Sequence, residues 1–160
     1  MARFIIVLFI FFATACKTTE QVVNINKDKL DNISFDAVTK TLEFNVIEHN
    51  QLNLIGKELI YDWYNDQVKT DGFEGSLKVI ITKLETETEK TEDYFKVTAI
   101  ISMQFKLESN TLSSKKSFSV NASEFSEISG KFSILDQENL SANTIKAVLN
   151  KITIELNSLN

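Results

Sequence analysis

The sequence predicts an α+β fold in which a four-stranded, mainly antiparallel sheet carries two helices on one face, in the order β-α-β-β-β-α. Apolar and polar residues alternate over four segments, which is typical of strands with one buried face. Over two other segments, apolar residues recur every three or four positions, which is typical of amphipathic helices. Because each element has a single apolar face, a sheet with both helices on its apolar side buries all of these faces in one core.

The length and composition fit one domain of this kind. The chain has 160 residues, of which 43% are hydrophobic and 24% are charged. We place the domain at residues 30–160, after a signal peptide at 1–15 and a polar tether at 16–29. Thirteen extended tether residues would span about 40 Å.

The first half of the domain is predicted to contain two strands, a helix and a turn. Residues 33–38 fit a short strand. The stretch TLEFNVI, 41–47, fits a second strand with three apolar side chains on one face: Leu42, Phe44 and Val46. Residues 52–68 have the spacing of an amphipathic helix. Gly72 is expected to end this helix in a left-handed conformation, and GFEG, 72–75, is expected to form the turn to the next strand.

Residues 76–109 are predicted to form two strands joined by an acidic hairpin tip. The second strand has the clearest alternation in the chain, with these residues on its apolar face: Phe95, Val97, Ala99, Ile101, Met103, Phe105 and Leu107. A fourth strand follows, with three inward residues: Phe118, Val120 and Ala122. Glu124 and Phe125 break its alternation, so we expect a bulge or the end of the strand there.

The domain is predicted to close with a long helix. Ser133 and Asp136 have the spacing of a capping box, in which each side chain bonds the backbone N–H of the other residue. The apolar stripe of this helix comprises Ile145, Val148, Leu149, Ile152, Leu156 and Leu159.

The N-terminal segment has the architecture of an export signal. Arg3 supplies a positive charge, residues 4–12 are apolar, and the small residues Ala13, Thr14 and Ala15 precede Cys16. The apolar run has nine residues, whereas a permanent transmembrane helix needs about 20. Cleavage after Ala15 with secretion of a free protein, lipid attachment at Cys16 and an uncleaved anchor are the alternatives.

The sequence ATAC resembles the lipobox of bacterial lipoproteins, which favours lipid attachment. The resemblance implies that Cys16 becomes the new N-terminus and carries a thioether-linked diacylglycerol with fatty-acid chains such as palmitate. In lipoproteins of two-membrane bacteria, an aspartate after the cysteine commonly retains the protein at the inner membrane. Because Lys17 stands there, the resemblance implies the periplasmic face of the outer membrane.

The charge balance disfavours nucleic acid as a partner. The net charge is −5, and Arg3 is the only arginine. Nucleic-acid readers rely on the planar arginine fork for bidentate contacts. The sequence shows no basic patch and no reading motif, so we expect no nucleic-acid binding.

The residues also disfavour an enzyme. Cys16 is the only cysteine and His49 the only histidine, so the usual zinc sites and a Cys-His pair cannot form in the domain. A Ser-His-Asp triad remains arithmetically possible, yet no Gly-x-Ser-x-Gly elbow is present. GFEG lacks the lysine of a phosphate loop. We expect no catalytic activity, no cofactor and no metal.

One acidic cluster has two interpretations. Glu85, Glu87 and Glu89 alternate onto one side of a strand, with Glu92 and Asp93 across the turn. Their oxygens could hold a hard cation. We favour a solvated hairpin that discourages edge pairing, because the spacing matches no calcium loop.

Two neighbouring aromatic residues also have two interpretations. Trp63 and Tyr64 could stack on a ligand, but their helical spacing with Leu59 and Ile60 indicates core residues. If the sheet leaves part of this aromatic surface uncovered, that part is the natural partner surface.

The order of the elements is similar to that of two groups of bacterial envelope lipoproteins. It resembles the accessory lipoproteins of lipopolysaccharide transport, which sit within or beside an outer-membrane barrel. The helix LIGKELIYDWYNDQVKTDGF and the strands that follow it also resemble uncharacterised proteobacterial envelope lipoproteins with a tryptophan in the first helix and a Gly-x-x-Gly turn. Transport accessories often carry glycine and an aromatic residue where this chain has Lys17 and Thr18, which favours the second group.

These resemblances imply a membrane-anchored, non-enzymatic accessory of envelope assembly or transport with an envelope protein as its partner. The alternative is a module that binds a lipid or another amphiphile between the helices and the sheet, for example as an auxiliary to an envelope ABC-type transporter.

Overall fold

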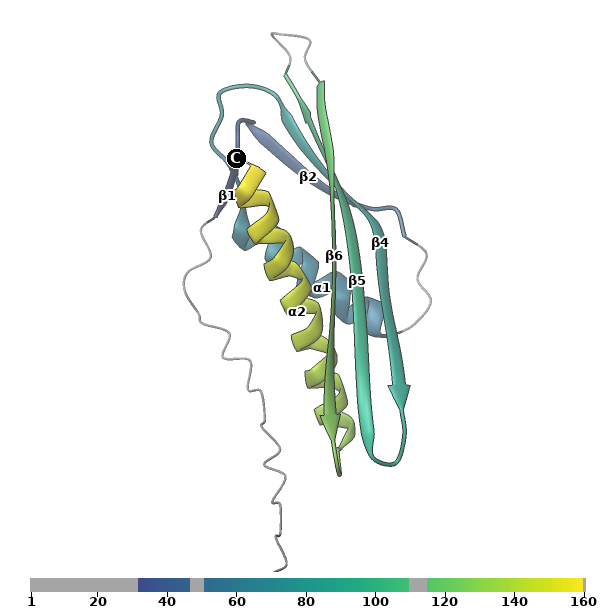
Figure 1. Cartoon of the computed structure of the whole chain (residues 1–160). Helices are drawn as coiled ribbons and strands as arrows, with labels where there is room; N and C mark the ends of the chain where they lie inside the picture. Colours follow the sequence, from purple (N-terminus) through teal and green to yellow (C-terminus); the bar gives the residue numbers. More distant parts are fainter. Residues whose placement is uncertain (1–31, 47–50, 110–114, 160) are drawn as a thin grey trace, which may run out of the picture.

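A computed structural model describes residues 32–46, 51–109 and 115–159 (Figure 1). Its elements follow the chain in this order: β1 (Ile33–Phe35), β2 (Thr39–Phe44), α1 (Gln51–Gln67), β3 (Val68–Thr70), β4 (Ser76–Lys90), β5 (Tyr94–Glu108), β6 (Lys115–Ser129) and α2 (Ile134–Leu159). The strands β4, β5 and β6 have 15 residues each and form the body of a sheet. The predicted α+β fold with two helices is confirmed.

The larger sheet has the strand order β2-β4-β5-β6. β4 and β5 pair antiparallel, as do β5 and β6, whereas β2 runs parallel to β4. Parallel neighbours need a crossover connection, and α1 supplies it between β2 and β4. The sheet is therefore mainly antiparallel, as the sequence predicts.

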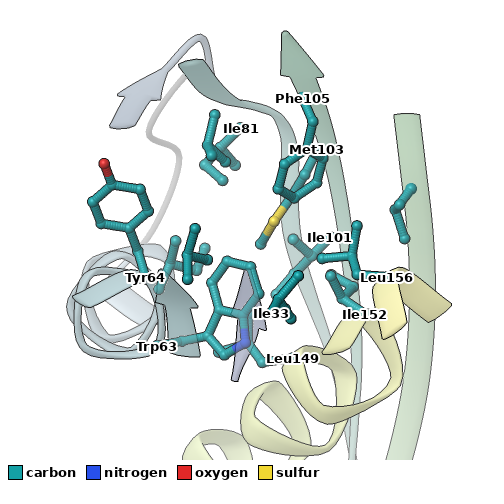
Figure 2. Close-up of a cluster of buried hydrophobic side chains, with 14 of the residues drawn as sticks. Ile33, Trp63, Tyr64, Ile81, Ile101, Met103, Phe105, Leu149, Ile152 and Leu156 are labelled. Carbon is teal, nitrogen blue, oxygen red and sulfur yellow. The ribbon is translucent and has the colours of Figure 1, made fainter. Parts of the chain in front are cut away.

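The inner face of β5 forms the centre of the core. The residues of this face that are at most 5% exposed are Phe95, Val97, Ala99, Ile101, Met103 and Phe105. The last four of them, Ala99 to Phe105, belong to one hydrophobic cluster with Ile60 of α1 and Ile152 of α2. Figure 2 shows side chains from both helices and the strands packed together. Burying one large apolar side chain stabilises a fold by about 1.5–3 kcal/mol, so this cluster holds both helices against the sheet.

A bulge keeps the apolar residues of β4 on the inner face. The register between β4 and β5 shifts between Ile81 and Lys83. The β4 residues of the core cluster are Leu77, Val79 and Ile81 before the shift and Leu84 after it, and Thr86 is buried two residues further on. One extra residue reverses the parity of a strand, so the bulge corrects a pattern that would otherwise turn Leu84 outward.

The expectation that β6 bulges or ends at Glu124 and Phe125 is wrong, because its pairing with β5 stays in register through both residues. Glu124 occupies an inward position because Lys151 of α2 places its ammonium 2.6 Å from the carboxylate. The same ammonium donates to the carbonyl oxygen of Ser123 at 3.1 Å. Phe125 faces outward and is 60% exposed, and the ammonium of Lys96 lies 5.1 Å from its ring centroid.

The short strand predicted near residue 33 forms, but it lies outside the larger sheet. β1 pairs in parallel with β3, which follows α1 directly. Ile33 and Phe35 are buried. The Phe35 ring stacks on Phe105 of β5 and Phe118 of β6, with centroid distances of 5.7 and 6.4 Å. β1 therefore covers part of the inner face of the sheet.

The prediction that Gly72 ends α1 is wrong, because the helix ends at Gln67 and the chain continues into β3. Gly72 lies in the turn between β3 and β4, where its N–H donates to the carbonyl oxygen of Ala37 at 3.1 Å. The left-handed conformation occurs instead at Gly75, whose φ is 85°.

The predicted capping box at the start of α2 is confirmed. The backbone N–H of Ser133 donates to Asp136 Oδ2 at 2.7 Å, and the N–H of Asp136 donates to Ser133 Oγ at 3.2 Å. The first of these bonds lowers the pKa of Asp136. The predicted apolar stripe is buried except at Leu159, which is 61% exposed.

Candidate functional site

Two of the residues singled out in the sequence, Cys16 and His49, lie outside the described residues. The described part of the chain therefore contains no cysteine and no histidine. No group of three acidic side chains within it could hold a metal ion. Among the described helices, none combines the length and apolar character that a membrane span requires. The chemistry of the described residues therefore comes from aromatic, hydroxyl and charged side chains.

Trp63 is held between the two helices. Trp63 and its neighbour Tyr64 are each 7% exposed, and Figure 2 shows the Trp63 ring directed toward Leu149 of α2. Trp63 Nε1 donates to Thr153 Oγ1 at 2.9 Å, and that hydroxyl donates to the carbonyl oxygen of Leu149 at 3.0 Å. A buried indole N–H usually finds a partner of this kind. Both aromatic residues belong to the core, so they leave little aromatic surface for a partner.

Lys40 of β2 points inward and closes the C-terminal end of α1. Its ammonium donates to the carbonyl oxygens of Tyr64 at 2.9 Å and Val68 at 2.6 Å, and it lies 4.3 Å from the Tyr64 ring centroid. The last carbonyls of a helix carry partial negative charge, so a cation is favourable there. Burial and the charge of Lys69 lower the pKa of Lys40, whereas Asp66 acts in the opposite direction. This ammonium is committed to the backbone and does not form an open anion site.

The phenol of Tyr64 is buried beside this contact. Its oxygen has no hydrogen-bond partner among the described residues. Burial raises the pKa of Tyr64, so the phenol stays protonated at neutral pH. A neutral phenol without an adjacent base is not an activated nucleophile.

A shallow hollow of about 330 Å³ lies between α1 and α2. The edge of Trp63 contributes to it, together with Asp62 and Asp66 of α1 and Lys146 of α2. Its volume is near the lower limit of ligand pockets, which span about 300–1,000 Å³ and enclose most of their ligand. An open hollow with mixed charges fits a contact surface better than an enclosed ligand site.

Two carboxylates of the β4–β5 hairpin have separate partners. Glu85 lies 3.0 Å from the ammonium of Lys83, and Glu89 accepts a hydrogen bond from the Tyr94 hydroxyl. The hydrogen bond to Glu89 raises the pKa of Tyr94. Within the described residues these carboxylates do not converge on one point, so the arrangement is that of a solvated hairpin.

The turn between β3 and β4 exposes an aromatic residue that the strand and helix patterns do not single out. Phe73 is 100% exposed. The sequence contains a signal for this exposure: Phe73 lies between Gly72 and Gly75, Asp71 and Glu74 are close to it in the chain, and no large apolar residue stands two or three positions away.

This turn is held in place on both sides of Phe73. Its hydrogen bonds are Asp71 N to Phe35 O (3.2 Å), Gly72 N to Ala37 O (3.1 Å), Val38 N to Gly75 O (3.2 Å) and Ser109 Oγ to Glu74 Oε1 (2.8 Å). A side chain at Gly72 would collide with Asp36, and one at Gly75 would collide with the carbonyl oxygen of Glu108. The glycines therefore permit a close approach of the turn to its neighbours.

Comparison with solved structures finds several bacterial lipoproteins of low similarity. A minor lipoprotein from Acinetobacter baumannii has a TM-score of 0.41 and 11% identity, with 76% of this chain and 93% of that one covered. The rare lipoprotein B from Shewanella oneidensis has a TM-score of 0.32 and 11% identity, covering 77% and 100%. Lipoprotein GNA1162 from Neisseria meningitidis has a TM-score of 0.32 and 12% identity, covering 74% and 96%.

At these scores the similarity establishes neither a family nor a function for the chain. No family model and no curated protein matches the sequence.

Proposed function

We propose that this chain is a bacterial envelope lipoprotein, anchored through a diacylglycerol on Cys16, which serves as a non-enzymatic accessory of envelope assembly or transport. The observation that carries the proposal is the N-terminal sequence, in which a positive charge, nine apolar residues and three small residues lead directly to the only cysteine. Each buried methylene contributes about 0.8 kcal/mol, and two acyl chains suffice for stable anchoring.

The sequence after Cys16 supports a location at the periplasmic face of the outer membrane. Lys17 replaces the aspartate that commonly retains such proteins at the inner membrane. The polar tether then allows the domain to stand about 40 Å from the membrane surface.

The accessory role is supported by the surface of the domain. Two features of this surface are a shallow hollow between α1 and α2 and a hydrogen-bonded turn that exposes Phe73. These features offer contact surfaces for another macromolecule. We expect that macromolecule to be an envelope protein.

Binding of an amphiphile between the helices and the sheet is less well supported. Such a ligand needs space on the inner face of the sheet. Met103 and Ile101 of β5 and Ile145 and Ile152 of α2 fill this region with 0% exposure. We therefore rank the accessory role above the amphiphile-binding role.

Mass spectrometry of the N-terminal peptide from native membranes tests the anchor. We expect a peptide that begins at Cys16 and carries a diacylglycerol, and we expect the Cys16→Ala variant to lack this modification and to leave the membrane fraction. A native N-terminus at another residue, or an unmodified thiol at Cys16, would refute the proposal.

A further inference from the structure

We propose that the turn carrying Phe73 is the element through which the domain docks on a protein partner, and that this partner presents an apolar pocket with a basic rim. The inference rests on the proposed accessory role and adds to it the surface and the chemistry of the partner.

The exposure of Phe73 is the first observation. Its side chain is 100% exposed, whereas the next most exposed large apolar residue in the described part of the chain is Ile134, at 75%. Burial of a phenylalanine side chain is worth about 1.5–3 kcal/mol, which the domain leaves unused at this position. A second exposed apolar residue, Val38, is 53% exposed and donates its backbone N–H to the Gly75 carbonyl oxygen of the same turn.

The rigidity of the turn is the second observation. Backbone hydrogen bonds fix residues 71, 72 and 75, and Glu74 accepts a bond from Ser109, so the backbone at Phe73 is already ordered before docking. Ordering a flexible loop is one of the main costs of association. With the backbone fixed, the part of the binding cost that comes from ordering this turn is mainly the side-chain freedom of one ring, which makes Phe73 suitable as an anchor residue.

The charge around Phe73 indicates the charge of the partner's binding surface. Asp36 lies against Gly72, and Asp71 and Glu74 flank the ring in the chain. The nearby ammonium of Lys115 is paired with Glu108 at 3.1 Å and does not neutralise them. Complementary potentials steer and orient protein association, so the matching pocket carries lysine or arginine at its rim. An anionic bilayer surface would be repelled by the same carboxylates.

Photo-crosslinking from the anchored full-length chain in native cells tests this inference. The probe is p-benzoylphenylalanine placed at position 73, with the same probe at position 125 as the matched control. Phe125 is also an exposed phenylalanine, 60% exposed, but it lies on the outer face of the sheet. We expect one crosslinked protein from position 73 only, with apolar and basic residues in the crosslinked peptide.

A charge-reversal variant tests whether the crosslink at position 73 comes from specific docking or from random collision. Asp71→Lys should lower the crosslink yield at position 73 by about tenfold, because it places a cation against the basic rim. The control Glu87→Lys, on the hairpin of β4 and β5, should leave the yield unchanged.

Several outcomes would overturn the inference: no crosslink at position 73, crosslinks to lipid or to a second copy of the chain, equal yields at positions 73 and 125, or no response to Asp71→Lys. A further probe at Asp62, in the hollow between α1 and α2, distinguishes failure of the Phe73 docking surface from failure of the accessory role. A protein captured there but not at position 73 would preserve the accessory role and refute this surface.

Discussion

Removing the hydroxyl of Thr153 should destabilise the domain far more than the same change elsewhere on α2. The Thr153→Val substitution leaves the indole N–H of Trp63 buried without its acceptor, which lies at 2.9 Å in the native protein. An unsatisfied buried donor costs about 1–3 kcal/mol. A loss of about 2 kcal/mol lowers the folding equilibrium constant about 30-fold. With an unfolding entropy of about 2.1 cal/mol/K per residue over roughly 130 residues, the melting temperature falls by about 7 °C.

Thr144 provides the matched control. Like Thr153, it has 0% exposure, but its hydroxyl donates only to the carbonyl oxygen of Leu140 in its own helix, at 2.8 Å. Replacing Thr144 by valine removes a donor without leaving a side-chain donor unsatisfied, so we expect a change within about 0.5 kcal/mol. Urea unfolding followed by far-ultraviolet circular dichroism measures both variants. Equal destabilisation by Thr144→Val and Thr153→Val would refute the role assigned to the Trp63 hydrogen bond.

Three further predictions use the same unfolding assay. Gly75→Ala should destabilise the domain more than Gly130→Ala. Both glycines have a positive φ, at which a side chain costs about 1–2 kcal/mol. Only at Gly75 would the new Cβ also collide with a backbone carbonyl oxygen. The hydrogen bond from Lys151 lowers the pKa of Glu124 below its usual 4.5. This ion pair therefore stabilises the folded state fully above pH 4.5, and its stabilisation is lost as the pH falls through the lowered pKa. Glu124→Gln should therefore flatten the loss of stability below pH 4.5, and an unchanged pH profile would contradict the assignment. Lys40→Met should cost about 1.5–3 kcal/mol, because it removes charged hydrogen bonds to the end of α1 and the start of β3. A neutral result would show that water replaces the ammonium there.

Local patterns determine most of the fold. The alternation of β5 predicts its buried face because one side of the strand meets the helices and the other meets water. The capping box of α2 is predictable for a similar reason, since Ser133 and Asp136 satisfy each other within one turn. The spacing of Trp63 and Tyr64 likewise predicts their burial.

The features that the sequence does not predict depend on partners far along the chain. The inward glutamate Glu124 indicates an end of β6 in the sequence pattern, because its partner Lys151 stands 27 residues later in the chain. The pairing of β1 with β3 joins two three-residue segments that lie on opposite sides of α1 in the chain. The pattern of β1 indicates a strand, but nothing in either segment indicates which strand it pairs with. The acceptor for Trp63 is Thr153, 90 residues away. Phe73 differs from these, because its isolation between glycines and acids is a local signal.

The contact between Lys151 and β6 also disfavours self-association through the edge of the sheet. β6 is the last strand of the larger sheet, and an edge of 15 residues is a template on which another chain can add a strand. Lys151 occupies the carbonyl oxygen of Ser123 near the middle of that edge and places a positive charge beside it. This one side chain thus interrupts the edge on which another chain could add a strand.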